Sequence, residues 1–205
     1  EAQTPYISSG TWSLLGVEQN KAHTSKSALD AGYSNEGSLN HTVRLQINIM
    51  GLWMIQQVRH ELGDKYSFAE LADMARANPV PYEINVNDQR FLAPENMTAE
   101  INAAVGKELT VGEMAYVIFN NLAKEYDNSV KALEEVTGEK YDTLNIIGGG
   151  SKTQFFLKLP QGRGDKIHPR RDVSRAGDVV AARVRILVGA PFLQEDLHLS
   201  TTLPH

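Results

Sequence analysis

The sequence lacks cysteine, which excludes disulfide bonds and thiolate metal sites. It also lacks any apolar run close to the roughly 18 residues that a membrane span requires. Basic residues are not in excess, because 20 lysines and arginines face 25 acidic residues and the net charge is −5. This balance argues against nucleic acid or an anionic membrane as the main partner. The six histidines are scattered and show no metal-ligand spacing.

A targeting segment is missing from the start of the chain as well. The first residues, EAQTPY, include no basic start, no apolar segment and no initiator methionine. We therefore expect a cytoplasmic protein, and we infer that residue 1 is not a natural beginning.

What is present is enough for a packed α/β domain. The chain has 205 residues, of which 41% are hydrophobic, so it can bury a sizeable core. Turn residues and apolar periodicity predict a hairpin over 5–18, a polar loop over 19–40 and a strand that turns at Met50 into a helix ending at Leu62. A capping box at Ser67 and Glu70 begins a helix over 67–78, which an ordered loop over 78–97 follows. A short helix capped by Thr98, a long helix over 111–136 and a strand over 143–147 that leads into another helix complete the pattern. Strands that alternate with helices favour a three-layer α/β fold.

Two turns in this pattern have the composition of ligand-binding loops. The hairpin turn, Ser8 to Thr11, carries only hydroxyls and a glycine, so it could direct backbone N–H groups and hydroxyls at one anion. The second turn is the triplet 148–150, where three glycines would let a flat ring or a phosphate lie directly on the backbone. Its spacing matches neither the Rossmann nor the Walker motif. A plain tight turn is the alternative interpretation of each, but two such loops in one domain favour a nucleotide.

A family resemblance covers both turns and the chain between them. The segments YISSGTWSLLGVE, NEG, INIMGLWMIQQVRHEL, VNDQRFLAPENM, GEMAYVIFNNLAKEY and LNIIGGGSK occur here in that order. Together, over about residues 5–152, they resemble the C-terminal domain of the FGGY family of sugar kinases, and within that family its rhamnulokinase branch. The resemblance implies an actin-like, ribonuclease-H-like ATPase domain, the C-terminal lobe of a two-lobed kinase.

The resemblance also implies roles for individual residues. Those expected to bind ATP are Gly10 and Thr11 at the phosphates, Gly148 and Gly149 at the adenosine, and Gln56. Asn48 is expected to bind the sugar. From the residues alone, Gln56 could equally be a polar residue at the edge of the core, and Asn48 could be a helix cap.

The implied reaction is the ATP- and Mg²⁺-dependent phosphorylation of L-rhamnulose to its 1-phosphate. In the family an aspartate takes the hydroxyl proton, and it belongs to a segment upstream of the hairpin turn. We therefore assign no catalytic residue and no metal ligand here, and we expect this chain alone, without the N-terminal lobe, to be inactive. Glu18 and Glu36 are candidates for the base only by proximity, while Glu134 and Glu135 are expected on a solvated helix end. The alternatives are another FGGY ketose kinase, of fuculose or xylulose type, or a nucleotide-binding remnant without turnover.

The end of the chain departs from the family pattern. We expect a kinase domain over residues 1–160 and a divergent, poorly packed tail over 161–205. Six of the ten arginines lie in the last 53 residues. A shifted reading frame beyond about residue 152 or 168 would explain this change, and a basic tail that binds an anion or a partner is the alternative.

Overall fold

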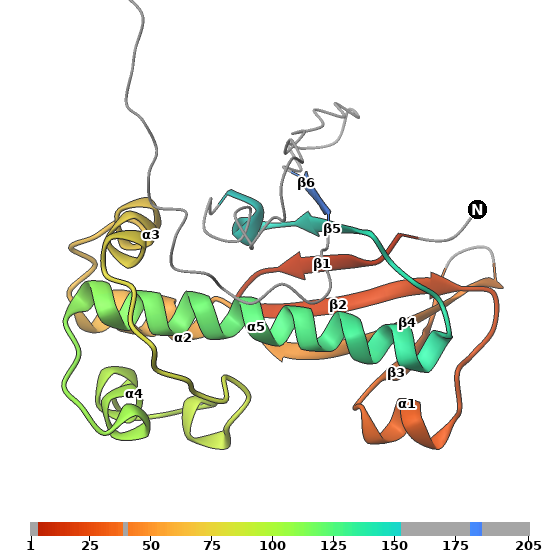
Figure 1. Cartoon of the computed structure of the whole chain (residues 1–205), viewed down its shortest axis with the longest axis horizontal. Coiled ribbons are helices and arrows are strands. Elements are labelled where there is room, and N and C mark those ends of the chain that lie inside the picture. The colour runs from red at the N-terminus through yellow and green to blue at the C-terminus, as the bar shows by residue number, and fades with distance from the viewer. Residues whose placement is uncertain (1–3, 39–40, 153–180, 186–205) are drawn as a thin grey trace, which may run out of the picture.

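The structure is a computed structural model that describes residues 4–38, 41–152 and 181–185. Figure 1 shows its elements in chain order. The strands are β1 (Tyr6–Ser9), β2 (Trp12–Gln19), β3 (Ser34–Gly37), β4 (Val43–Met50), β5 (Thr143–Ile147) and β6 (Ala181–Arg185). The helices are α1 (Lys26–Asp30), α2 (Trp53–Glu61), α3 (Phe68–Ala77), α4 (Met97–Val105) and α5 (Val111–Thr137), with 3₁₀ turns η2 (Gln89–Phe91) and η3 (Gly149–Lys152).

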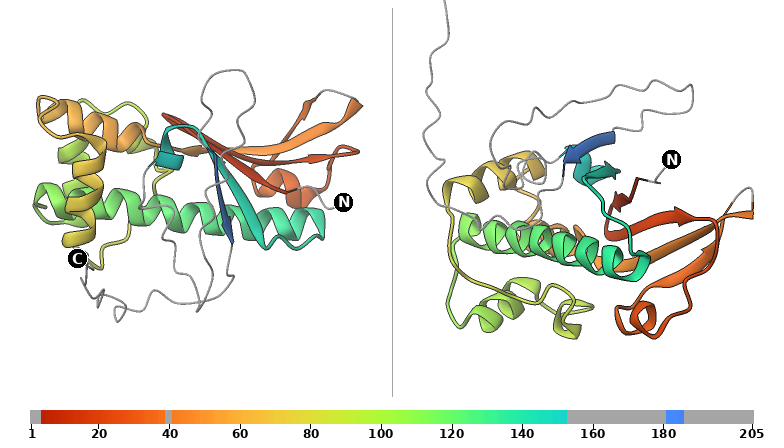
Figure 2. Two further views of the ribbon diagram at one scale, coloured as in Figure 1. Left: turned by 90° about the horizontal axis from the view of Figure 1, so that it is seen from above. Right: turned by 45° about the vertical axis from the view of Figure 1, so that its right-hand side comes forward.

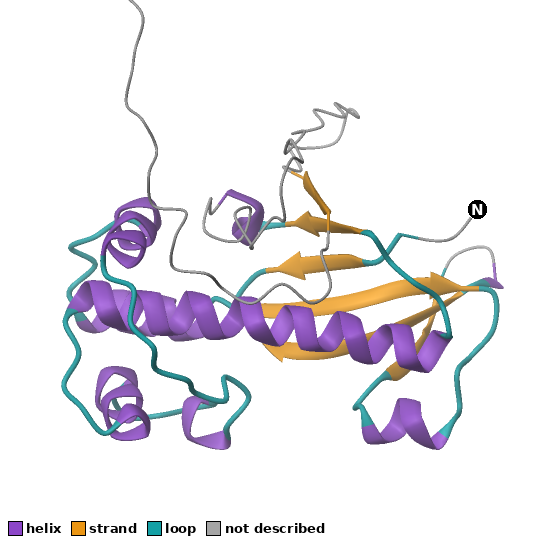
Figure 3. Ribbon diagram, in the orientation of Figure 1, coloured by secondary structure: helices purple, strands orange, loops and turns teal. Residues whose placement is uncertain are grey.

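The strands form one mixed sheet in the order β3-β4-β2-β1-β5-β6. All neighbours are antiparallel except β1 and β5, which run parallel with Ser8 opposite Ile147. The chain therefore builds four antiparallel strands first, with β4 between β2 and β3, and returns through the helices to add β5 beside β1 (Figure 3). Because β1 and β5 are parallel, the turns that follow them lie at the same edge of the sheet.

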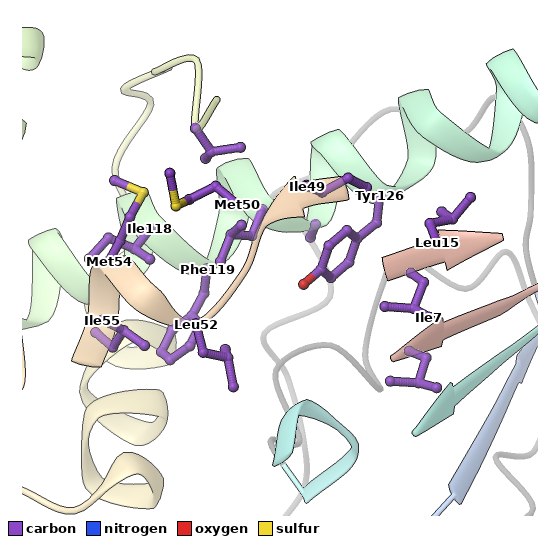
Figure 4. Packing of buried hydrophobic residues seen from close by; sticks show 14 of the residues in the cluster. Ile7, Leu15, Ile49, Met50, Leu52, Met54, Ile55, Ile118, Phe119 and Tyr126 are labelled. Carbon is purple, nitrogen blue, oxygen red and sulfur yellow. The ribbon is translucent and has the colours of Figure 1, made fainter. Parts of the chain in front are cut away.

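Helices cover one face of the described sheet. The long α5 packs on β2 and β4, and α1, α2 and α3 pack in turn on α5 (Figure 2). Fully buried apolar side chains of the strands lie on this face, among them Ile7, Leu15 and Ile49 (Figure 4). Alternate residues face the other way, and there Asn48 and Trp12 are exposed.

The ends of the two best-predicted helices follow from their caps. The Thr110 hydroxyl accepts from the Glu113 N–H while the Glu113 carboxylate accepts from the Thr110 N–H, and Gly138 ends α5 at φ 73°. Ser67 and Glu70 form the same reciprocal pair at the start of α3. Both helices confirm the prediction from sequence.

Other boundaries were predicted wrongly. The segment 19–40 is not all loop, because it contains α1 and β3. Met50 is still part of strand β4, and α2 begins only at Trp53. The cap of α4 is Asn96, whose Oδ1 accepts from the Ala99 N–H at 2.7 Å, so Thr98 already lies inside the helix. In each case a local polar residue or a pairing partner far along the chain decided the boundary.

Most of the expected tail lies outside the described residues, and so does the expected helix beyond Lys152. The hypothesis of a shifted reading frame concerns the same residues. The part of 161–205 that is described is β6, which pairs antiparallel with β5 so that Val184 is opposite Leu144. Within the described ranges, no helix is long and apolar enough to cross a membrane.

Candidate functional site

The hairpin turn between β1 and β2 is held by the start of α2. The N–H of Leu52 donates to the Gly10 carbonyl at 2.9 Å, and the N–H of Trp53 donates to the Thr11 carbonyl at 3.0 Å. This approach requires a glycine at position 51, because an added Cβ would lie 2.6 Å from the Gly10 oxygen and 2.7 Å from the Thr11 oxygen. The backbone of the turn is therefore fixed by two amides that helix α2 cannot satisfy internally.

The fixed carbonyls set the direction of the turn's donors. All described peptide bonds are trans, so the N–H of a peptide unit points opposite to its carbonyl. Because the Gly10 carbonyl points at α2, the N–H of Thr11 in the same peptide unit points away from α2. The start of α2 thus orients the turn, and its first two amides are used by the Gly10 and Thr11 carbonyls.

Thr11 and Gln56, two residues to which the family resemblance gives a role in ATP binding, lie together at this turn. The Thr11 hydroxyl donates to Gln56 Oε1 at 3.1 Å, across 45 positions of sequence. Thr11 is exposed and Gln56 is half-buried on the first turns of α2. The carboxamide nitrogen of Gln56 carries two N–H donors, so the pair offers donors to an anion.

The glycine turn lies beside the hairpin turn, and two of its glycines are explained by packing alone. Gly148 has φ +87°, and an added Cβ would lie 2.7 Å from the Ser9 carbonyl oxygen. Gly150 is buried against the Ser9 side chain, and an added Cβ would come within 2.6 Å of the Ser9 Cβ. The last residue of β1 therefore contacts both ends of the glycine triplet.

Gly149 differs from its two neighbours. It is exposed, its φ is not positive, and an added Cβ would meet only Leu52 and Ser9 at 3.8 Å, which is ordinary contact. Nothing in the packing of the described chain requires a glycine here. The open backbone at Gly149 is the part of this turn that a flat ligand could cover.

A buried hydroxyl cluster lies beneath the two turns, and sequence reasoning missed it. Ser13 Oγ and the Tyr126 hydroxyl are 2.6 Å apart, although 113 positions separate them. Tyr126 extends from α5 toward the strands that carry Ile7 and Leu15 (Figure 4). Burial raises the pKa of Tyr126, while the Ser13 and Ser9 hydroxyls beside it act in the opposite direction. The phenol thus stays protonated and bridges α5 to the hairpin.

Asn48 lies apart from these turns, on the face of the sheet opposite α5. It is inside β4, directly across from Leu14, and its side chain is exposed. It is therefore not a helix cap, and the N-cap position of α2 is Leu52, which makes no side-chain cap hydrogen bond. Leu14 is three residues from Thr11, so the strand rise puts Asn48 about 10 Å from the tip of the turn.

Two of the four acidic residues considered from sequence, Glu18 and Glu134, have structural partners. Glu18 accepts from the Ser38 and Thr42 hydroxyls at 2.7 Å each, and these hydrogen bonds lower its pKa. It is seven residues from Thr11 along β2, roughly 23 Å away. Glu134 is not solvated as expected, because it is buried and accepts from Tyr141 N–H at 2.9 Å and Lys140 Nζ at 2.7 Å.

Elsewhere in the described chain, neither the one polar cleft considered below nor any group of acidic and histidine side chains forms a second candidate catalytic or metal site. A polar cleft of about 360 Å³ lies between the loop around Asn85 and the middle of α5, and none of the residues predicted to bind ATP lines it. Burial raises the pKa of Glu125 at this cleft, and Asn87 Nδ2 donates to it at 2.8 Å. Over the described ranges, no three of the histidine, aspartate and glutamate side chains gather as metal ligands.

Comparisons with known proteins agree with this arrangement. Residues 5–161 match the C-terminal domain of the FGGY family of carbohydrate kinases. The rhamnulokinase of Lactiplantibacillus plantarum is 44% identical over 160 residues, which are 75% of this chain and 33% of that protein. The rhamnulokinase of Halalkalibacterium halodurans is 39% identical over 170 residues, which are 80% of this chain and 36% of that protein. The chain thus spans about a third of the length of these curated relatives.

A solved structure supports the fold. The xylulose kinase from Bifidobacterium adolescentis aligns with a TM-score of 0.51 at 18% identity, over 75% of this chain and 30% of that one. The predicted α/β fold of an actin-like, ribonuclease-H-like kinase lobe is confirmed. The family match covers three-quarters of the sequence and includes the hairpin turn and the glycine turn. On these grounds the chain belongs to the FGGY family of carbohydrate kinases, of which it contains the C-terminal domain.

Proposed function

We propose that this chain is the nucleotide-binding lobe of an ATP-dependent kinase that phosphorylates L-rhamnulose at O1. The observation that carries the proposal is the juxtaposition of the two turns at the carboxyl ends of β1 and β5. One turn is exposed at Thr11 and has the two N–H donors of the Gln56 carboxamide beside it, and the other presents bare backbone at Gly149. The rhamnulokinases among the relatives support the choice of sugar.

Each of the two turns binds a different part of the nucleotide. Gly10 and Thr11 hold the phosphates through the turn and the Thr11 hydroxyl, with Gln56 as a second donor from α2. Gly148 and Gly149 lie under the adenosine, where a side chain would block contact with the backbone. In phosphoryl transfer such positioned donors stabilise the charge on the transferred group. Positioning and this stabilisation of charge are the main contributions of an enzyme to the rate of the reaction.

The sugar and the remaining chemistry need more than this lobe. Asn48 binds a hydroxyl of the ketose on the open face of the sheet. Mg²⁺ enters with the phosphates of ATP as part of the substrate. The carboxylate that takes the proton from O1 belongs to an N-terminal lobe, because Glu18 is committed to Ser38 and Thr42 at the far end of β2. We assign the reaction to the cytoplasm, and the kinase domain to residues 1–160, without the tail.

A chimeric enzyme tests this function directly. Residues 5–161 would replace the matched third of the Lactiplantibacillus plantarum rhamnulokinase, and ketose phosphorylation would be followed by ³¹P NMR with L-rhamnulose, L-fuculose and xylulose. We expect turnover of L-rhamnulose above the other two, and none by the 205-residue chain alone. A folded chimera that prefers fuculose or xylulose would move the chain to another branch. One that binds ATP without any turnover would indicate a nucleotide-binding remnant.

A further inference from the structure

The face of the sheet away from α5 carries an apolar pair, Trp12 and Leu14, that the described chain leaves partly exposed. Trp12 is 48% exposed at the start of β2, and Leu14, on the same face, is half-buried. Large aromatic side chains are seldom left in water, and an exposed apolar patch with a polar rim is typical of a ligand-binding surface. This patch lies directly beyond the hairpin turn that begins β2.

Polar groups flank this apolar pair on the same face. The register of the sheet places Ser8, Leu14 and Asn48 side by side on three neighbouring strands. Neighbouring strands are about 4.8 Å apart, so the Ser8 hydroxyl and the Asn48 carboxamide stand on either side of Leu14, roughly 10 Å from each other. Trp12 is the diagonal neighbour of Asn48, within reach of an aromatic side chain.

The pattern of apolar floor and polar rim matches a sugar rather than a nucleotide or a peptide. A furanose ring has a C–H face that packs on an aromatic ring and hydroxyls at its edge that need donors and acceptors. An asparagine carboxamide supplies both kinds of hydrogen bond. The order along β2 also fits, because Thr11 at the phosphates is followed by Trp12 and then Leu14.

We propose that Trp12 and Leu14 form the apolar half of the ketose subsite, and that Leu14 selects a 6-deoxy sugar. The inference rests on the proposed function and adds two specificity-determining residues to it. With O1 directed at the turn, the ring lies over Trp12 and the C6 methyl group lies at Leu14, about 7 Å further along the strand. A 6-hydroxy ketose places a hydroxyl there and leaves it without a partner, so it binds more weakly.

Saturation-transfer NMR on the 205-residue chain tests the inference, because it reports which ligand protons touch a protein even at weak affinity. The probes are L-rhamnulose and L-fructose, which differ only by the C6 hydroxyl, in the presence of MgATP. We expect the C6 methyl group to receive strong transfer, and L-rhamnulose to bind about tenfold more tightly than L-fructose, the order of effect expected when a hydroxyl is buried without a partner. Trp12→Ala should weaken both sugars, whereas Leu14→Ala should abolish the preference.

The matched control is Leu29→Ala, since Leu29 is another exposed leucine, 76% exposed on α1. It should change neither sugar. A second readout is tryptophan fluorescence. The sequence has two tryptophans, and in Trp53→Phe only Trp12 remains, so the fluorescence of this variant should respond to L-rhamnulose. Circular dichroism of every variant identifies any that fails to fold.

The outcomes separate this inference from the proposed function. Transfer and preference unchanged in both Trp12→Ala and Leu14→Ala would overturn the inference, even if Asn48→Ala lost sugar binding. The absence of any sugar signal from a folded chain that binds MgATP would overturn it as well, and would leave the nucleotide site standing. If the folded chain bound neither MgATP nor sugar, the inference and the proposed function would both fail.

Discussion

Gly150 packs directly on the side chain of Ser9, and a Cβ added at position 150 would lie 2.6 Å from the Ser9 Cβ. Ser9 is the last residue of β1 and its carbonyl also lies against Gly148, so one strand end fixes the position of both turns. The nucleotide site proposed above therefore has its two halves on a common support. Packing on Ser9 therefore requires glycine at positions 148 and 150, but not at position 149, where the backbone is open to a ligand.

Alanine substitutions at the two glycines should have opposite effects. Gly150→Ala forces a methyl group into Ser9, and overpacking of this kind costs about 1–3 kcal/mol of unfolding free energy. Gly149→Ala meets only atoms at 3.8 Å, so stability should change little while ATP affinity falls. Urea unfolding and ATP titration of both variants check this. Equal losses of stability would contradict the assignment of Gly149 to a ligand.

A methyl group at position 51 should disturb the hairpin turn. Gly51→Ala places a Cβ 2.6 Å from the Gly10 oxygen, which must move and break the hydrogen bond from Leu52. We expect a loss of about 2 kcal/mol from overpacking and the lost hydrogen bond together. Gly37→Ala is the matched control, because an added Cβ there meets nothing within 4 Å. A Gly51→Ala variant as stable as this control would show that the turn tolerates the shift.

The buried hydroxyl pair should behave as a coupled unit. Tyr126→Phe leaves Ser13 without the hydroxyl 2.6 Å away, and Ser13→Ala does the same to Tyr126. Tyr126→Phe should cost about 1–3 kcal/mol, as expected for a buried polar group that loses its partner, and Ser13→Ala should cost less, because the Ser9 hydroxyl remains beside Tyr126. The double variant should cost less than the sum of the two, which chemical unfolding of all four proteins measures. Strict additivity would mean that the two hydroxyls do not interact in solution.

Acid should weaken α5 through its capping box. Hydrogen bonds from Thr110 lower the pKa of Glu113 below its ordinary 4.5. The Glu113 carboxylate therefore has a lower pKa in the folded chain than in the unfolded chain. This stabilisation is present above the unfolded pKa and is lost as the pH falls through the folded pKa. Thermal unfolding from pH 7 to pH 3 should therefore show the gap between wild type and Glu113→Gln closing below about pH 4.5. A gap between the two proteins that stays the same down to pH 3 would contradict this account.

Features coded within a short stretch of chain were predictable from sequence. The capping box of α3, the end of α5 at Gly138 and the two turns all depend on residues a few positions apart. Family resemblance added Gln56 and Asn48, which local pattern alone could not have marked.

What sequence missed depends on contacts between distant segments. The strand β3 exists because it pairs with β4, not because SNEG has a strong strand propensity. The Ser13–Tyr126 pair spans 113 positions. Gly51 was a readable signal, since a glycine at a strand-to-helix junction often marks a close backbone approach, but its partner could be named only from the structure.

The measurement that tests the account most directly is ATP binding to the 205-residue chain by isothermal titration calorimetry, with Thr11→Val as the paired variant. Valine keeps the shape of threonine and removes the hydroxyl that donates to Gln56. The account predicts that the chain binds MgATP and that Thr11→Val weakens the affinity about tenfold, the equivalent of one good hydrogen bond to a charged group. Unchanged affinity in the variant, or no binding by the folded chain, would contradict the claim that these two turns form a nucleotide site.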